Sequence, residues 1–223
     1  MGLLNYDEQM ANLQRLDNMA AALREYSRSI DGSAQAVRDC WGMNEDCAAV
    51  LNHLNELKGN LLGKVLHDME HFQRQASILL IRMNGLEQLV FIGLLPFMPV
   101  LGYIHCLQKP RISIDANRLS EVCTQLHVSM RKLEGIKDGT RGILRKVDPE
   151  ILSQAGLLTA KSAIFAGLDR MLDMQYRITQ ALEKIVMFYY DADERVKRKA
   201  QEIKVPPPNL GLIYRSSFED SAD

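Results

Sequence analysis

A histidine pair flanking an acid is the motif with the clearest chemistry. His67, Glu70 and His71 form an H-x-x-E-H pattern. Histidines four residues apart share one helical face and can hold a zinc ion, with the glutamate as base of a metal-dependent hydrolase. The apolar neighbours fall on the inward face of the predicted helix, which leaves both histidines in solvent. The sequence therefore favours a solvated pair over a zinc site, and no cofactor is expected.

Aromatic residues paired with acids form a second constellation. Tyr189 and Asp193 are four residues apart, and so are Tyr190 and Glu194, so each pair presents a ring beside a carboxylate on one helical face. A basic cluster over residues 195–199 follows. This order is typical of a solvated helix end, and the alternative is an electrostatic docking site.

The chain's one tryptophan, Trp41, is followed directly by Gly42. Both lie where one predicted helix ends and the next begins. A large aromatic side chain at such a turn predicts a core anchor that closes one end of a helical bundle. Its functional interpretation depends on what faces it.

Four stretches must position these groups, each with apolar residues at alternating spacings of three and four. This spacing predicts amphipathic helices. The stripes run over residues 13–41, 47–90, 119–147 and 168–203. Short connections near residues 43 and 147 predict antiparallel neighbours. The expected fold is all-α, an elongated four-helix bundle of two antiparallel helical hairpins.

The predicted organisation has four parts: a hairpin over 1–90, an apolar connector over 91–113, a second hairpin over 114–204, and a flexible proline-rich tail over 205–223. No Lys, Arg, Asp or Glu lies between Gln88 and Gln108. That length reaches the roughly 20 residues needed to cross a bilayer, but prolines and glycines interrupt it. The alternatives are a buried or hairpin-capping connector, membrane contact or a partner-binding patch. The contact residues would be Phe91, Leu94, Leu95, Phe97, Met98 and Leu101.

The two hairpins, with Trp41-Gly42 at one turn and Tyr189-x-x-x-Asp193 at the end of the last helix, resemble the Trp-x-Gly superfamily of type VII secretion substrates. The chain is similar to a fused pair of such hairpins with one signal element from each half, although its glycine follows Trp41 directly. The resemblance implies a composite export signal, Trp41 and Gly42 with Tyr189, Tyr190, Asp193 and Glu194. A membrane-bound secretion ATPase would read this signal.

The resemblance implies a non-enzymatic protein that acts as secreted substrate, partner or targeting chaperone of a larger effector. Its partners would be a helical protein and the ATPase, with possible membrane contact. The N-terminus shows no cleavable signal peptide, so synthesis in the cytoplasm and secretion by another route are expected. Two alternatives stay open: a membrane-active protein inserting an apolar hairpin over residues 86–107, and the metal-dependent hydrolase described above.

Composition limits the remaining classes. Lys and Arg total 27 against 28 Asp and Glu, a net charge of −1, which argues against a nucleic-acid binder. The chain has 223 residues, enough to bury a core without disulfides. Its four cysteines show no paired metal-ligand spacing, and free thiols are expected.

Overall fold

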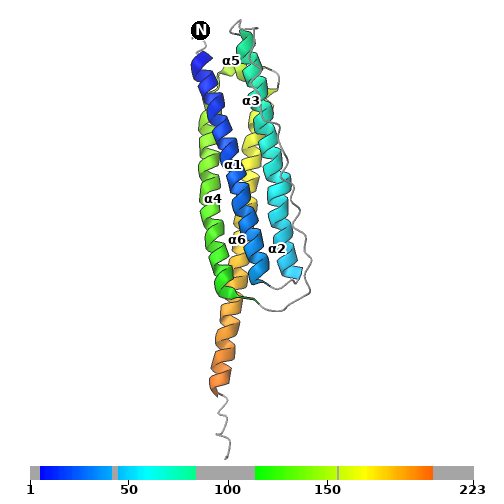
Figure 1. The fold of residues 1–223 in the computed structure, drawn as a ribbon, viewed down its shortest axis with the longest axis vertical. Helices are drawn as coiled ribbons and strands as arrows, with labels where there is room; N and C mark the ends of the chain where they lie inside the picture. Colours follow the sequence, from blue (N-terminus) through cyan, green and yellow to red (C-terminus); the bar gives the residue numbers. More distant parts are fainter. Residues whose placement is uncertain (1–5, 42–44, 84–113, 155, 203–223) are drawn as a thin grey trace, which may run out of the picture. The chain divides into compact units, whose positions relative to one another are not determined.

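The computed structural model describes residues 6–41, 45–83, 114–154 and 156–202 (Figure 1). Nearly all of these residues are helical, and the all-α class predicted from the sequence is confirmed for them. The elements are α1 (Tyr6–Cys40), α2 (Glu45–Glu56), the π-helix η1 (Leu57–Leu62), α3 (Gly63–Met83), α4 (Ala116–Arg145), α5 (Pro149–Leu152) and α6 (Leu157–Glu202).

The chain divides into two compact units, Met1–Val186 and Met187–Asp223. The first holds α1 to α5 and the part of α6 up to Val186. The second holds the rest of α6. The limits expected from the sequence, at residues 90, 113 and 204, stay predictions.

Helix α1 runs antiparallel to α4 and is held to it at both ends. At one end the Asp115 backbone N–H donates to the Cys40 carbonyl at 2.8 Å. At the other end Gln9 donates to the Lys146 carbonyl and accepts from the Asp148 N–H, each at 3.2 Å. Because these contacts satisfy backbone groups that helix ends leave unpaired, they fix the two helices in register.

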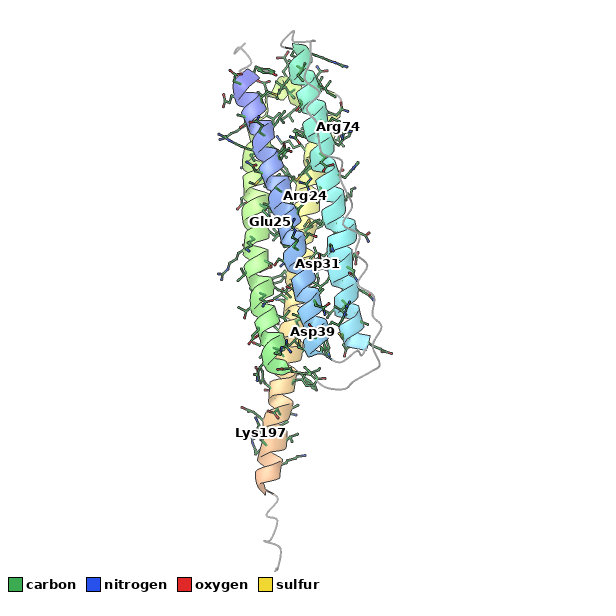
Figure 2. The ribbon with its side chains drawn as sticks, viewed as in Figure 1. Arg24, Glu25, Asp31, Asp39, Arg74 and Lys197 are labelled. Carbon is green, nitrogen blue, oxygen red and sulfur yellow. The ribbon has the colours of Figure 1, made fainter. Side chains whose placement is uncertain are left out.

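Helix α1 also runs antiparallel to the α2–η1–α3 segment. Arg24 pairs with Glu70 of α3 at 2.9 Å, and Asp31, further along α1, pairs with Lys58 of η1 at 2.6 Å. Figure 2 shows Arg24 and Asp31 at successive levels of α1. Later residues of α1 thus meet earlier residues of its partner.

These two pairings place the ends that flank residues 84–113. The end of α3 at Met83 lies toward the start of α1, whereas Ile114, just before α4, lies at the end of α1. The two flanking residues are therefore at opposite ends of the first unit. The connector itself, and the expectation that it caps or is buried by the hairpins, lies outside the described residues.

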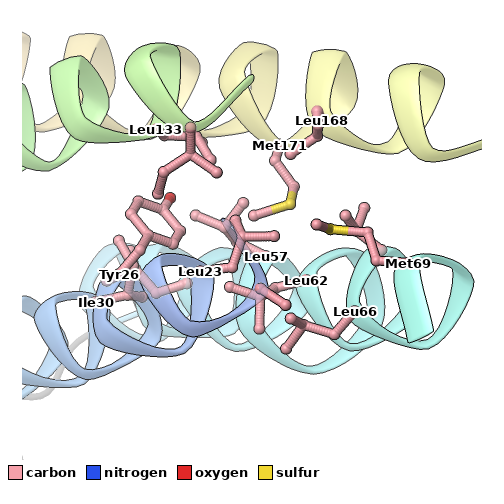
Figure 3. Close-up of a cluster of buried hydrophobic side chains, with 14 of the residues drawn as sticks. Leu23, Tyr26, Ile30, Leu57, Leu62, Leu66, Met69, Leu133, Leu168 and Met171 are labelled. Carbon is pink, nitrogen blue, oxygen red and sulfur yellow. The ribbon is translucent and has the colours of Figure 1, made fainter. Parts of the chain in front are cut away.

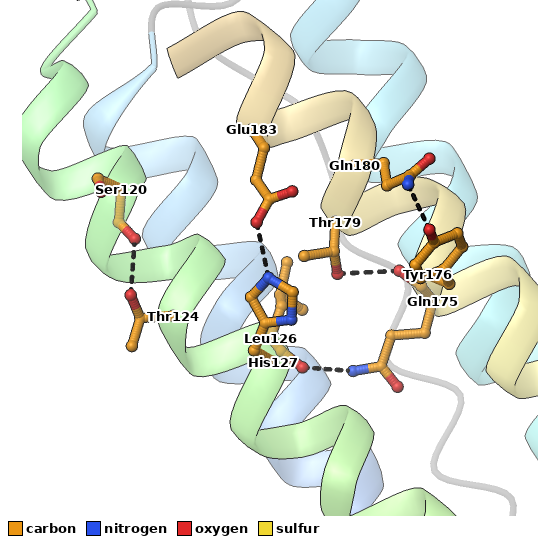
Figure 4. Close-up of polar contacts among 9 residues, drawn as sticks. All are labelled: Ser120, Thr124, Leu126, His127, Gln175, Tyr176, Thr179, Gln180 and Glu183. Atoms are coloured by element: carbon orange, nitrogen blue, oxygen red, sulfur yellow. Dashed lines mark hydrogen bonds and ion pairs between the residues drawn. The ribbon is translucent and has the colours of Figure 1, made fainter. Parts of the chain in front are cut away.

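Helices α4 and α6 are also antiparallel. Asp169, near the start of α6, accepts from Lys137 at 2.8 Å and from Arg141 at 2.7 Å, both late in α4. His127, earlier in α4, lies 2.6 Å from Glu183, later in α6 (Figure 4). The pairs lie on the half-exposed rim of the unit and contribute about 0–1 kcal/mol each.

The sequence predicts one short turn between two long helices near residue 147, and the connection between α4 and α6 differs from it. Asp148 accepts from the Glu150 N–H at 2.8 Å and Pro149 follows it, as the cap-and-proline pattern predicts. The helix that starts there, α5, has only 4 residues. Gly156 then adopts a φ of 74°, which glycine tolerates best, and α6 begins after it.

The inward stripes predicted over residues 13–41 and 119–147 are confirmed. Each residue selected by the three-four spacing, from Leu13 to Trp41 and from Leu119 to Val147, is buried. The other two stripes hold only in part. Leu61 and Leu79 are half-buried and Met83 is 40% exposed. In α6 the predicted stripe is buried through Leu182 but not beyond, and Val196 is 64% exposed. Amphipathic spacing thus continues along α6 past the end of the packed unit.

The π-helix η1 explains the departure within the second stripe. A π turn holds more residues than an α turn, so apolar spacing read at 3.6 residues per turn shifts across it. Leu57 and Leu62 become buried while Leu61 turns partly outward, and Lys58 is brought to the inner side with only 8% of its side chain exposed. The predicted second helix therefore consists of three successive segments.

The core draws on every element of the first unit, from α1 to the first part of α6. Figure 3 shows Leu23, Tyr26 and Ile30 of α1 facing Leu133 and Met171 of the opposite helices. Each such fully buried large side chain contributes roughly 1.5–3 kcal/mol.

Two glycines allow close helix approach in this unit. A Cβ on Gly167 of α6 would overlap the Val65 side chain of α3. A Cβ on Gly139 of α4 would lie 2.8 Å from the Met19 sulfur of α1.

Candidate recognition site

The last part of α6 carries the aromatic–acid pairs predicted to form a signal. Tyr189 is half-buried, and the Phe188 ring packs edge-on against it with centroids 5.7 Å apart. Tyr190 is 41% exposed, and Asp193 and Glu194 are exposed. The four predicted residues therefore lie on one helix of the second unit with their acidic groups open to solvent.

The charges on this segment are ordered. Asp191, Asp193 and Glu194 precede four basic residues, Arg195, Lys197, Arg198 and Lys199, and all seven are exposed. Lys197 donates to Asp193 at 2.7 Å, and this hydrogen bond raises the pKa of Lys197 (Figure 2). The acidic side lies nearer the tyrosines, so an approaching group meets ring and carboxylate together.

Large apolar side chains are exposed beside these charges. Met187 is 66% exposed, Phe188 68% and Val196 64%. Met187 and Val196 lie on opposite sides of the helix, so these are separate exposed side chains and not one patch. The sequence placed Tyr189 and Val196 on an inward stripe, whereas Tyr189 is only half-buried and Val196 is exposed.

Trp41 lies in the core of the first unit, with 2% of its surface exposed. It forms an isolated antiparallel bridge with Ile114, at the level where Asp115 bonds to Cys40. Its indole N–H has no hydrogen-bond partner in the described structure. This position fits the anchor interpretation, in which Trp41 shapes the end of the unit. Gly42 lies outside the described residues.

Cys40, Cys47 and Cys123 are buried cysteines, whereas Cys106 lies outside the described residues. Burial, followed by the nearby Glu183 carboxylate, raises the pKa of Cys123 to about 11. Such a thiol stays protonated near neutral pH, which makes it a poor nucleophile.

The H-x-x-E-H residues do not converge with a further ligand. His67 and His71 are exposed, as their spacing predicts, and Glu70 is engaged by Arg24. Among the residues that the structure describes, no three His, Cys, Asp or Glu side chains are placed to hold a metal ion.

The six predicted membrane- or partner-contact residues, from Phe91 to Leu101, lie outside the described residues. No helix within the described ranges combines the length and apolar character needed to span a bilayer.

A groove between α2 and α6 was not foreseen. It has a volume of about 520 Å³. Its apolar lining includes Val50, Leu61, Met174 and Ile178, and charged groups of both signs, among them Glu56, Arg170, Asp173 and Arg177, lie at its border. Leu61, which the π-helix turns partly outward, is one of the apolar residues that line this groove.

Comparisons of the chain with protein-family models, with curated proteins and with solved structures gave no match.

Proposed function

We propose that this chain is a non-enzymatic helical protein of a type VII-like secretion pathway. It acts as secreted substrate, partner or targeting chaperone of a larger effector. The observation that carries the proposal is the exposed end of α6, where two tyrosines each precede an acid by four residues on a solvent-facing helix.

The proposed signal has two parts with different physical roles. Tyr190, Asp193 and Glu194 offer ring and carboxylate groups that a secretion ATPase reads directly, with Tyr189 stiffened by the Phe188 ring. Trp41, together with Gly42, shapes the end of the helical unit. The burial of Trp41 supports this structural role.

We further propose that the packed unit is a four-helix bundle of two antiparallel hairpins, each recognising a helical partner through its side faces. The antiparallel contacts of α1 with α3 and of α4 with α6 support this arrangement. The groove between α2 and α6, apolar in its lining and bordered by charges of both signs, has the chemistry that receives an amphipathic helix.

Export is tested by release of the tagged chain into the medium of the producing cell. Y190A/D193N and Y189A/E194Q are expected to abolish release while the helical circular dichroism stays unchanged, because these side chains lie at or near the surface. The matched control is Y176A/E134Q, which removes an exposed tyrosine and an exposed glutamate from the first unit, both outside the groove. Release of the signal variants at the control's level would contradict the proposal.

A further inference from the structure

The inference concerns the groove between α2 and α6 and what fills it. Its apolar lining is partly open to solvent, since Leu61 and Met174 are half-buried and Ala181 is exposed. The charged residues of the lining balance in sign: Glu56, Asp173, Arg170 and Arg177. Within α6, Arg177 and Asp173 pair with each other at 2.8 Å. A lining of this kind favours an apolar occupant without charges of its own.

The groove lies midway along the first unit. Gln175, in the stretch of α6 that lines it, bonds to Tyr26 in the middle of α1. The described residues stop at Met83 and resume at Ile114, at opposite ends of this unit. The two ends are separated by nearly the length of α1, about 50 Å for its 35 residues. Residues 84–113 reach about 100 Å when extended, so they have the length to run past the groove.

The surface offers two routes for this connection. Helices α3 and α4 are not packed against each other in the described part of the chain, because α1 and α6 lie between them. A segment that joins them over the surface therefore crosses α1 or α6. The outer face of α1 is charged, with Arg15, Glu25 and Arg28 exposed (Figure 2). No large hydrophobic side chain of this fully described helix is exposed, whereas the α6 side holds the apolar groove.

The composition of the connecting segment matches the second route. No Lys, Arg, Asp or Glu lies between Gln88 and Gln108, and residues 89–104 read LVFIGLLPFMPVLGYI. Against the charged face of α1 these side chains would find few apolar neighbours, but in the groove they would cover apolar surface and be covered by it.

We propose that the groove between α2 and α6 is an intramolecular docking site, and that its occupant is residues 89–104 of the same chain. The balanced charges of the lining suit this uncharged segment. A helical partner, as proposed above, then binds this groove only by displacing residues 89–104.

Cross-linking of introduced cysteines in the full chain tests the proposal. Gly93→Cys and Gly102→Cys, used in turn with Cys106→Ser, place a thiol in the segment and keep its large side chains. Each is combined with Ala181→Cys in the groove or with the control Gly32→Cys on α1. Both of these positions are exposed, and each lies the same number of residues beyond the Tyr26–Gln175 bond. A Cβ at position 32 meets nothing within 4 Å.

A short bismaleimide is expected to link the segment to position 181 at least tenfold more than to position 32, within one chain. Equal yields, a higher yield at position 32, or no link at either position overturns the proposal. Links to position 181 that join two chains overturn it as well, since they assign the groove to a second copy.

A second measurement needs no cysteine. M174E/A181E adds two carboxylates to the groove lining and is expected to raise the rate of chymotrypsin cleavage within residues 89–104 at least tenfold. The control, A21E/G32E, adds the same charges at two exposed positions of α1 and is expected to leave that rate unchanged. Circular dichroism checks that both variants stay helical, and A181E alone replaces the double variant if its helical signal falls.

Cleavage of the groove variant at the control's rate overturns the proposal. Release of the chain into the medium is a separate measurement, with its signal variants at positions 189–194. An empty groove would therefore leave the proposed export standing, and loss of export would leave the docking of residues 89–104 standing.

Discussion

The phenolic O–H of Tyr26 in α1 donates to the side-chain oxygen of Gln175 in α6 at 2.6 Å, inside the core. The amide of Gln175 in turn donates to the Leu126 carbonyl of α4 at 2.9 Å, and its backbone carbonyl accepts from Thr179 (Figure 4). One glutamine therefore joins three helices at a single level. A satisfied polar layer of this kind penalises any sliding of one helix along another.

Removing the Tyr26 hydroxyl tests this layer. Tyr26→Phe leaves the Gln175 oxygen buried without its donor, and we expect a loss of about 1–3 kcal/mol in the free energy of unfolding. Urea denaturation measures it. The control is Tyr176→Phe, whose exposed hydroxyl accepts from Gln180 at the surface, with an expected change within about 0.5 kcal/mol. Equal losses in both variants would show that the buried hydrogen bond contributes no more to the free energy of unfolding than the exposed one.

Glycine substitutions on α6 and α4 are expected to have opposite signs. Gly167→Ala drives a methyl group into Val65 and should cost about 1–3 kcal/mol. Gly142→Ala meets nothing within 4 Å and should stabilise α4 by about 0.5–1 kcal/mol, since alanine favours the helix. Thermal unfolding distinguishes the two. Adding Val65→Ala to Gly167→Ala should recover part of the loss, and no recovery would argue against the overlap as its cause.

The Lys58–Asp31 pair is asymmetric in burial, with 8% of the lysine side chain and 39% of the aspartate exposed. Asp31→Asn leaves a buried ammonium without its charge partner, so we expect a loss of about 1–3 kcal/mol, whereas Lys58→Met should cost less. Asp173→Asn, which breaks an exposed pair with Arg177, serves as control at about 0.5 kcal/mol or below. A larger loss for Lys58→Met than for Asp31→Asn, measured in urea, contradicts this ranking.

Alkaline pH should weaken the fold partly through Cys123. Its pKa is raised from 9.0 to about 11 in the folded chain, so between these values the unfolded thiol ionises while the folded one keeps its proton. Stability from this group is therefore complete below about pH 9 and falls as pH rises toward 11.

Comparison with Cys123→Ala isolates that contribution. The wild type should lose about 1–2 kcal/mol more than the variant between pH 9 and 11, a range discounted because the thiol is only partly desolvated. Stability is measured by urea denaturation at each pH. Parallel pH profiles for the two proteins would exclude the thiol as the cause.

The stripes of α1 and α4 could be predicted because nothing interrupts their 3.6-residue period. The course of α2 to α3 could not, because a π turn follows from packing rather than from any one residue, and it carries Lys58 inward against its usual preference. In the same way, the periodicity of α6 predicts that Val196 lies on the apolar face of the helix. It does not predict whether another element packs on that face.

The candidate site was predictable to a similar extent. Helical spacing alone places Tyr190 and Glu194 on one face, and both lie on α6 as expected. The position of Trp41 at a turn predicts a core side chain, but its bridge to Ile114, 73 positions further along the chain, has no local signal in the sequence. The groove at Met174 and Val50 likewise needs two distant helices to exist.

The contacts that fix α1 have a consequence for biosynthesis. Gln9 bonds to residues 137 and 139 positions later, and Tyr26 to one 149 positions later. As the chain leaves the ribosome, α1 and α3 can associate early. Their faces that pack against α4 and α6 remain exposed to water until those helices are synthesised. Large sequence separations of this kind slow folding. A nascent chain of this protein thus exposes a broad apolar surface for most of its synthesis, and that interval is when a chaperone has most to bind.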